Sequence, residues 1–230
     1  MAESLFIPYL LEEEMEPQRI ETFLRFCFAD LDCSRSPPEN ERTNDFGYTT
    51  EETDGIRYGG SIDEAVDSVT RQAGGTVWLW YDDLNVGIHI DSRSAEGPNV
   101  PRLTLSINEW YVKPWRNNRP NPIHDFVLEL YDYLSPIYVY GETYLDDAPL
   151  STEGIEAGHL EEVYWVNGFG PNMTTQIGRE RLLHAPTWRI DDCEDGGVFL
   201  WESPLPLSDG RQRNDDALRA YLGLNPNSTN

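Results

Sequence analysis

Lysine is almost absent from this chain. Of its 17 basic residues, 16 are arginine and Lys113 is the one lysine, whereas Asp and Glu together number 41. No apolar run approaches the roughly 18–20 residues that a membrane-spanning helix needs. The short apolar patch near the N-terminus has no basic residues before it, and three glutamates follow it. We therefore expect neither a membrane protein nor a secreted one, and we predict a cytoplasmic location.

The shortage of lysine accompanies an excess of acid that gives a formal net charge of −24. In molar salt the Debye length falls to about 3 Å, so repulsion among carboxylates is screened. Carboxylates also hold water and cations at the surface. The composition therefore resembles that of cytosolic proteins from salt-accumulating haloarchaea. The alternative is an acidic surface that binds a basic partner or imitates nucleic acid. Because the acidic residues are spread along the chain, a solvated surface is favoured.

Basic residues are too scattered for a nucleic-acid-binding protein, because affinity for nucleic acid comes from cationic contacts to phosphate. The one basic stretch is KPWRNNR at 113–119, and a polar loop between a strand and a helix explains it. We predict no nucleic-acid partner.

The few cysteines and histidines show no spacing typical of metal ligands. There is no CxxC pair, and no two histidines stand at HxH or i, i+4 spacing. We therefore predict no metal and no cofactor, and we expect Cys27 to lie in the core and His124 to support a helix start or contact solvent. The cysteines are Cys27, Cys33 and Cys193, and the histidines are His89, His124, His159 and His184.

The N-terminal part, residues 1–55, begins with a strand at 6–11 and continues with a helix at 16–31. Pro17 suits the first turn of that helix. The polar segment 32–55 contains a Pro pair and is predicted to be a long loop. The apolar stripe of the helix consists of Ile20, Phe23, Leu24, Cys27 and Leu31.

Residues 56–142 are predicted to form a β-α-β-β-β-α-β unit. Ser61 and Glu64 have the spacing of a capping box at the start of its first helix. Two strands then flank a hairpin turn at 82–85.

The next strand of this unit alternates Leu103, Leu105 and Ile107 with polar residues, so one of its faces is expected to be buried. A helix at 123–136 and a further strand follow. This order predicts an α+β protein, a two-layer sandwich in which helices pack on one face of a largely antiparallel sheet.

The C-terminal part, residues 143–224, is predicted to extend this unit with strands, a helix near 172–183, a β-hairpin and an amphipathic helix. No flexible linker divides the chain. We therefore expect one domain over 1–230, in which 1–55, 56–142 and 143–224 are parts.

The stretch RIDDCEDGGVFLWES, residues 189–203, has acidic residues at the offsets of a calcium loop. Asp191, Asp195, Gly196 and Glu202 match that pattern, but Cys193 occupies a ligand position and offers no hard oxygen. The flanking residues favour strands rather than helices. We predict a β-hairpin with a Gly-Gly turn.

Tryptophans are numerous, and two of them define a candidate binding site. Trp78 and Trp80 lie on the strand face opposite Val77 and Leu79. If both faces of the sheet are covered, these tryptophans belong to the core. If one face is open, Trp78 and Trp80 form a binding patch for a protein partner, next to Asp82 and Asp83 in the adjoining turn.

In the C-terminal third, an aromatic strand with YWVNGFGP leads to a helix ending in QIGRERLLHAP and then to WRIDDCEDGGVFLWESPLP. This pattern resembles a family of α+β immunity proteins that neutralise polymorphic toxins. The resemblance covers about residues 137–206 and implies a toxin as partner. Its landmarks are Trp165, Gly178, Leu182, Pro186, Gly196 and Gly197.

Two functions follow from these observations. The first is a non-enzymatic cytosolic protein-binding module from a halophile, an immunity-like inhibitor of a toxin. The alternative is an enzyme whose site is built from the loops 32–55, 82–85 and 113–121. Because no catalytic motif is present, we favour the binding protein and predict no catalytic residue.

Overall fold

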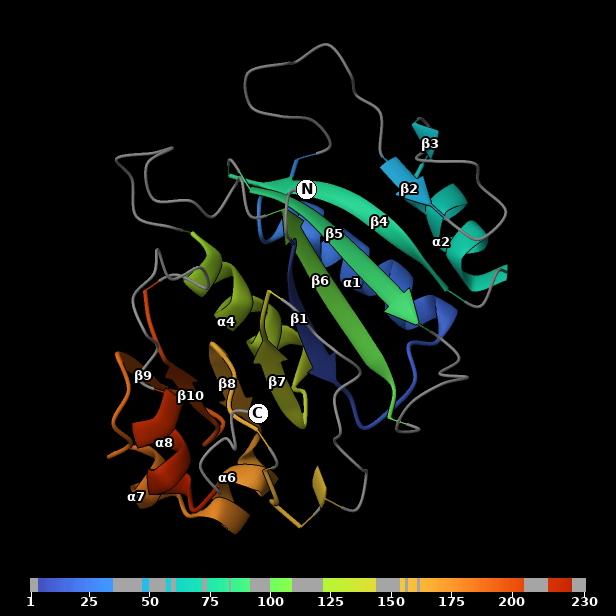
Figure 1. Ribbon diagram of the computed structural model, residues 1–230. Helices are drawn as coiled ribbons and strands as arrows, with labels where there is room; N and C mark the ends of the chain where they lie inside the picture. Colours follow the sequence, from blue (N-terminus) through green and yellow to red (C-terminus); the bar gives the residue numbers. More distant parts are fainter. Residues whose placement is uncertain are drawn as a thin grey trace, which may run out of the picture.

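Ten strands form one antiparallel sheet (Figure 1). The computed structural model defines residues 4–34, 47–49, 57–58, 61–71, 74–82, 84–91, 100–108, 122–143, 154–155, 157–160, 162–204 and 215–224. The strand order is β3-β2-β4-β5-β6-β1-β7-β8-β10-β9. Every hydrogen-bonded pair of neighbouring strands is antiparallel.

The strands are β1 (Ser4–Leu10), β2 (Gly47–Thr49), β3 (Arg57–Tyr58), β4 (Gly74–Tyr81), β5 (Leu84–Asp91), β6 (Arg102–Asn108), β7 (Tyr138–Gly141), β8 (Val166–Phe169), β9 (Arg189–Asp192) and β10 (Val198–Trp201). The helices are α1 (Pro17–Ala29), α2 (Ile62–Arg71), α4 (Ile123–Leu134), α6 (Pro171–Ile177), α7 (Arg179–Leu182) and α8 (Asp215–Leu222). None of the helices in the described ranges is long and apolar enough to cross a membrane.

The strands β4, β5, β6 and β1 bury one face, which we call the helix face. Leu5 lies opposite Ile107 and Ile7 lies opposite Leu105, and all four side chains are fully buried. They share one core with the buried residues of α1, α2 and α4. Figure 1 shows α1 behind these strands. Alternation of apolar and polar residues along each strand therefore produces the core, as the sequence predicts.

Both faces of the sheet are covered at β7, β8 and β10. On β10, Phe199 and Trp201 join the core under α4. Val198 and Leu200 point the other way, into a second core that includes buried residues of α6, α7 and α8. These three helices cluster around the β8, β9 and β10 end of the sheet (Figure 1).

The predicted fold class is confirmed: the chain is an α+β protein with an antiparallel sheet and helices packed against it. Over the central strands the helices lie on one face. The additional layer of α6, α7 and α8 opposite α4 was not foreseen, because β8 and β10 have four residues each and are buried throughout. A strand buried on both faces shows no alternation from which a second layer could be predicted.

The two N-terminal helices begin as the sequence predicts. Pro17 is the first residue of α1, whose apolar stripe is buried. At the start of α2 the backbone N–H of Glu64 donates to Ser61 Oγ at 3.2 Å. The backbone N–H of Ser61 donates to Glu64 Oε2 at 3.1 Å. The capping box therefore satisfies two amides that the helix itself leaves without partners.

Three local predictions need correction. The hairpin turn is shorter than predicted, because Tyr81 pairs with Leu84 and β5 already begins there. The expected loop 32–55 contains the short strand β2, which pairs with β4. The expected helix at 172–183 is two helices, because Gly178 adopts φ +103° between α6 and α7. A left-handed backbone at that position ends a helix.

Candidate binding surface

The second face of β4, β5 and β6 carries polar and aromatic side chains, and none of the described helices packs on it. We call this surface the open face. Apart from the buried Gly87, its residues are partly or fully exposed. Antiparallel sheets commonly have one face packed on the core and another without a helical cover. The residues of the open face are Thr76, Trp78, Trp80, Asn85, Gly87, His89, Thr104 and Ser106.

Trp78 reaches across β5 because Gly87 has no side chain. The two residues are directly opposite in the β4–β5 register, and Ser106 is opposite Gly87 on β6. A Cβ at Gly87 would lie 2.8 Å from Trp78 Cζ3 and 2.8 Å from Ser106 Oγ. The indole ring therefore occupies the space above Gly87. A glycine inside a strand often marks such a close approach, and this signal could have been used at the sequence level.

The neighbouring row of the open face is polar. Thr76 lies opposite His89, and His89 lies opposite Thr104. Thr76 Oγ1 and His89 Nδ1 are hydrogen-bonded at 3.1 Å. His89 is exposed, whereas the two threonines are partly buried. This row places hydrogen-bonding groups beside the aromatic surface of Trp78.

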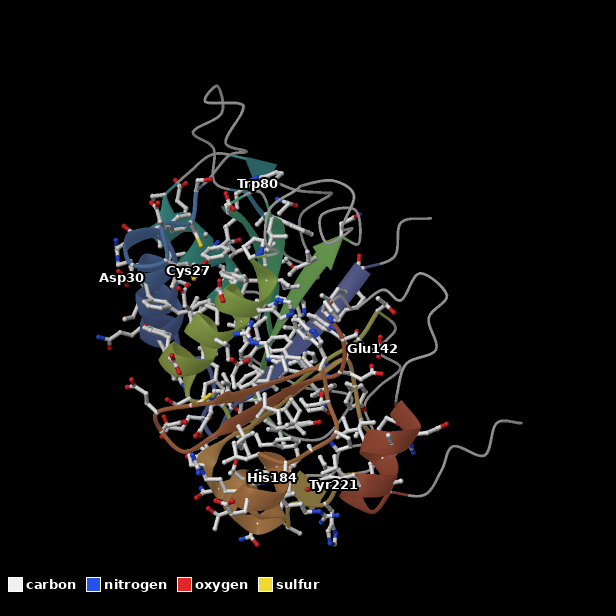
Figure 2. The ribbon with its side chains drawn as sticks, turned by 90° about the vertical axis from the view of Figure 1, so that its left-hand side faces the viewer. Cys27, Asp30, Trp80, Glu142, His184 and Tyr221 are labelled. Atoms are coloured by element: carbon white, nitrogen blue, oxygen red, sulfur yellow. The ribbon has the colours of Figure 1, made fainter. Side chains whose placement is uncertain are left out.

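Trp80 lies near the turn of the β4–β5 hairpin, where the backbone of Ser34 is its partner. The N–H of Ser34 donates to the carbonyl oxygen of Trp80 at 2.7 Å, and the N–H of Trp80 donates to Ser34 O at 2.9 Å. The side chain of Trp80 is partly buried. Figure 2 places Trp80 at the opposite end of the molecule from His184 and Tyr221.

The four predicted site residues are placed as follows. Trp78 and Trp80 share the open face, which is the arrangement that the sequence required for a binding patch. Asp82 is exposed in the turn beyond Trp80 and adopts φ +51°. An aspartate tolerates this left-handed conformation better than most residues. Asp83 lies outside the described residues.

The loops proposed for an enzyme lie mostly outside the described residues. Of 32–55 the structure defines 32–34 and 47–49, and of 82–85 it defines 82 and 84–85. Residues 113–121 lie outside the defined ranges. Of the residues that are defined there, Ser34 and β2 pair with β4, and residues 82, 84 and 85 belong to the β4–β5 hairpin.

A second aromatic cluster surrounds His124 at the start of α4. The His124 ring centroid lies 4.6 Å from that of Trp201, 5.4 Å from that of Trp188 and 5.8 Å from that of Trp165. His124 is only 6% exposed, so of the two roles expected for it, contact with solvent is wrong. It does lie in the first turn of α4, but that helix has no side-chain cap hydrogen bond. Trp188 is 48% exposed and is the one large apolar side chain with that exposure in the described ranges. Sequence could not find this cluster, because its members come from distant segments.

The stretch 189–203 forms the predicted β-hairpin of β9 and β10 rather than a calcium loop. Asp195 Oδ1 accepts a hydrogen bond from the N–H of Gly197 at 2.8 Å. Asp195 Oδ2 accepts another from the Tyr131 hydroxyl at 2.9 Å. Asp191 accepts hydrogen bonds from Arg189 and from the Trp201 indole. Each of these two carboxylates therefore stabilises the hairpin. Within the defined ranges, no three His, Cys, Asp or Glu side chains are arranged to hold a metal ion.

The hairpin turn is strongly acidic. Burial, together with Asp195 and other nearby carboxylates, raises the pKa of the Cys193 thiol to about 12. Partial burial and the negative charges of Asp195 and Glu194 raise the pKa of Asp132 above its ordinary value. Like charges held close together favour the neutral form of each group. Cys193 is therefore a thiol at neutral pH.

No protein-family model matches the chain, and no curated protein or solved structure is significantly similar to it.

Proposed function

We propose that the protein is a non-enzymatic binding module that holds a basic protein partner on the open face. The observation that carries the proposal is a sheet face with two tryptophans on which none of the described helices packs. On the opposite face of the same strands the apolar residues are fully buried. The apolar residues of these strands thus form the helix face, and the polar and aromatic residues form the open face, on which we propose that the partner binds.

The composition of the open face suits protein recognition. Tryptophan is enriched among the residues that contribute most to binding energy. Trp78 is partly exposed and its ring lies over Gly87, flanked by hydroxyl groups and by His89. An aromatic centre with a polar surround is the usual anatomy of a protein interface.

Charge defines the kind of partner. The chain has 41 acidic residues against 17 basic ones. Such a protein attracts cationic surfaces and repels acidic ones over distances set by the ionic strength. Asp82 adds an exposed carboxylate in the turn beyond Trp80. We therefore infer a partner with a positive, aromatic-poor contact surface.

The resemblance of residues 137–206 to immunity proteins supports a toxin as that partner, because a basic toxin active site is complementary to an acidic inhibitor. The near-absence of lysine supports a halophilic source and a cytosolic location, where such an inhibitor protects its own cell. Under this proposal the chain blocks the toxin by covering its basic site and performs no chemistry itself.

The test has two stages. Chemical cross-linking in lysate of the source organism, with the full-length protein as bait, identifies a candidate partner. Calorimetric titration of the purified partner then compares the wild type with Trp78→Ala and Trp188→Ala. We expect a partner with a net positive charge, and we expect Trp78→Ala to weaken binding about tenfold or more.

Trp188→Ala is the matched control, because it removes the same side chain from the far end of the sheet, next to β9, and six strands lie between β9 and β4. Its affinity should stay within about twofold of the wild type. Circular dichroism verifies that both variants fold. Equal losses in both variants, or an acidic partner, would contradict the proposal.

A further inference from the structure

Two cysteines meet where α1 ends. The chain reverses through Asp30 to Asp32, and Asp32 adopts φ +53°. This turn brings Cys33 back against the last turns of the helix, where its backbone N–H donates to the carbonyl oxygen of Cys27 at 3.0 Å. The backbones of two residues six positions apart are thereby held side by side, which is the first requirement for a disulfide bond.

The two side chains also share one buried environment. Cys27 and Cys33 both belong to the core under α1. Cys27 is fully buried, whereas Cys33 is 6% exposed. The neighbouring Cys33 thiol, followed by burial, raises the pKa of the Cys27 thiol. Cys27 is therefore protonated at neutral pH, and Cys33 is the more exposed of the two side chains.

We propose that Cys27 and Cys33 form a redox-active dithiol that hydrogen peroxide converts to an intramolecular disulfide. Peroxide first oxidises the Cys33 sulfur to a sulfenic acid and is itself reduced to one water molecule. The Cys27 sulfur then attacks that sulfur, the S–S bond forms and the sulfenic oxygen leaves as a second water. Two thiols and one peroxide therefore give one disulfide and two waters. Peroxide is small enough to reach a sulfur that is mostly buried.

The disulfide would fix the position of Ser34, which pairs with Trp80 next to the open face. Ser34 follows Cys33 directly, and its N–H and carbonyl group both pair with the backbone of Trp80. A covalent bond between Cys33 and α1 would hold this pairing in place and reduce the freedom of the unfolded chain. The inference stands on these contacts alone and is independent of what binds to the open face.

The sequence allows a direct chemical test on the wild-type protein. The folded protein is treated with hydrogen peroxide, remaining thiols are alkylated, and trypsin then releases the peptide FCFADLDCSR, residues 26–35, which contains both cysteines. We expect this peptide to resist alkylation and to be lighter by two hydrogen atoms than its reduced form. Cleavage before Asp30 and Asp32 should release residues 30–31 and leave the fragments 26–29 and 32–35 joined, so that these two separate only on reduction.

Two further measurements complete the test. Cys193 is the internal control, because its backbone pairs with Gly197 across the hairpin turn rather than with another cysteine, so it should still be alkylated after the same treatment. The oxidised protein should melt about 3 °C or more above the reduced one, and the Cys33→Ser variant should lose this shift. The proposal is overturned if the native protein keeps both thiols in excess peroxide, if Cys33 stops at a sulfinic acid, or if the disulfide joins Cys193.

Discussion

The hydroxyl group of Tyr131 occupies the space that a side chain at Gly197 would need. A Cβ at Gly197 would collide with this hydroxyl and would lie 2.8 Å from the carbonyl oxygen of Phe169. The same hydroxyl donates to Asp195, two residues before Gly197. A helix residue and a hairpin glycine therefore fit together at one point. This contact explains why the β9–β10 turn contains a second glycine after Gly196, whose φ of +92° already favours glycine.

Substitution of Gly197 by alanine should lower the free energy of unfolding by about 1 to 3 kcal/mol, because Tyr131 must move and its bond to Asp195 is strained. Gly196→Ala is the control, since nothing lies within 4 Å of a Cβ there and only the left-handed backbone opposes it. Its effect should be about 1 kcal/mol. Urea unfolding measures both variants. A smaller loss for Gly197→Ala than for Gly196→Ala would contradict the packing described here.

Two strand glycines each lie beneath an aromatic ring, one on the open face and one in the core. The cost of substituting each glycine by alanine therefore compares an uncovered sheet face with a covered one. Gly87 lies under Trp78 on the open face, whereas Gly168 lies under Phe199 in the core. Phe199 packs edge-on against Tyr131 with ring centroids 4.9 Å apart. Gly87→Ala should therefore cost less than about 1 kcal/mol, because Trp78 can tilt away, and Gly168→Ala about 2 to 3 kcal/mol.

Unfolding in urea gives both free energies, and tryptophan fluorescence should shift to longer wavelength only in Gly87→Ala as Trp78 becomes more solvated. Similar large losses in the two variants would mean that the ring of Trp78 is as confined as that of Phe199. In that case the open face would not be available to a partner.

The local structure that the sequence predicts correctly depends on neighbours along the chain. The α1 stripe, the capping box of Ser61 and Glu64, and the alternation in β6 each involve residues a few positions apart. The strand order could not be predicted, because β1 pairs with both β6 and β7, which come from distant segments. β2 was missed because three residues are too few to show alternation.

The candidate site was predictable only as far as it depends on neighbours along the chain. Alternation along β4 placed Trp78 and Trp80 on one face, but only the packing of the helices decides which face remains uncovered. The position of Trp78 over Gly87 depends on the register between two strands. The burial of His124 depends on three tryptophans from three separate segments. Such contacts are set by tertiary structure rather than by local propensity.

The acidic turn should make stability depend on pH in a defined direction. The pKa of Asp132 is raised above its ordinary value of 3.8 by burial and by Asp195 and Glu194. A carboxyl group whose pKa is raised in the folded state does not affect stability below its ordinary pKa, where it is neutral in both states, and it opposes folding at higher pH, where the group must ionise. Asp132→Asn should therefore stabilise the protein at neutral pH by about 0.5 kcal/mol, since the group is largely exposed. The gain should vanish as the pH falls through the raised pKa toward 3.8.

Thermal melts of the wild type and Asp132→Asn at a series of pH values measure this difference. Asp30→Asn provides the comparison, because Asp30 lies at the end of α1, away from the hairpin (Figure 2). A gain in Asp132→Asn that grows on acidification would contradict the assigned charge repulsion.

The excess of carboxylates should make folding dependent on salt. With a formal net charge of −24, self-repulsion is large in dilute buffer and is screened in concentrated salt. We expect helicity and melting temperature to rise steadily between about 0.1 and 3 M KCl. Circular dichroism measures both. An unchanged spectrum and melting temperature at the dilute end would contradict the proposed halophilic origin, and the acidic surface would then need to be explained by recognition of a partner.

The central claim is that a basic protein binds to the open face, and a single added charge tests it most directly. Thr104→Arg places a cation on that face, and Gln18→Arg places the same cation on the exposed side of α1, across the sheet. With the partner identified by cross-linking, calorimetry should give an affinity at least about tenfold weaker for Thr104→Arg, because like charges meet in the complex. Gln18→Arg should stay within about twofold of the wild type. Equal affinities for the two variants would contradict the account.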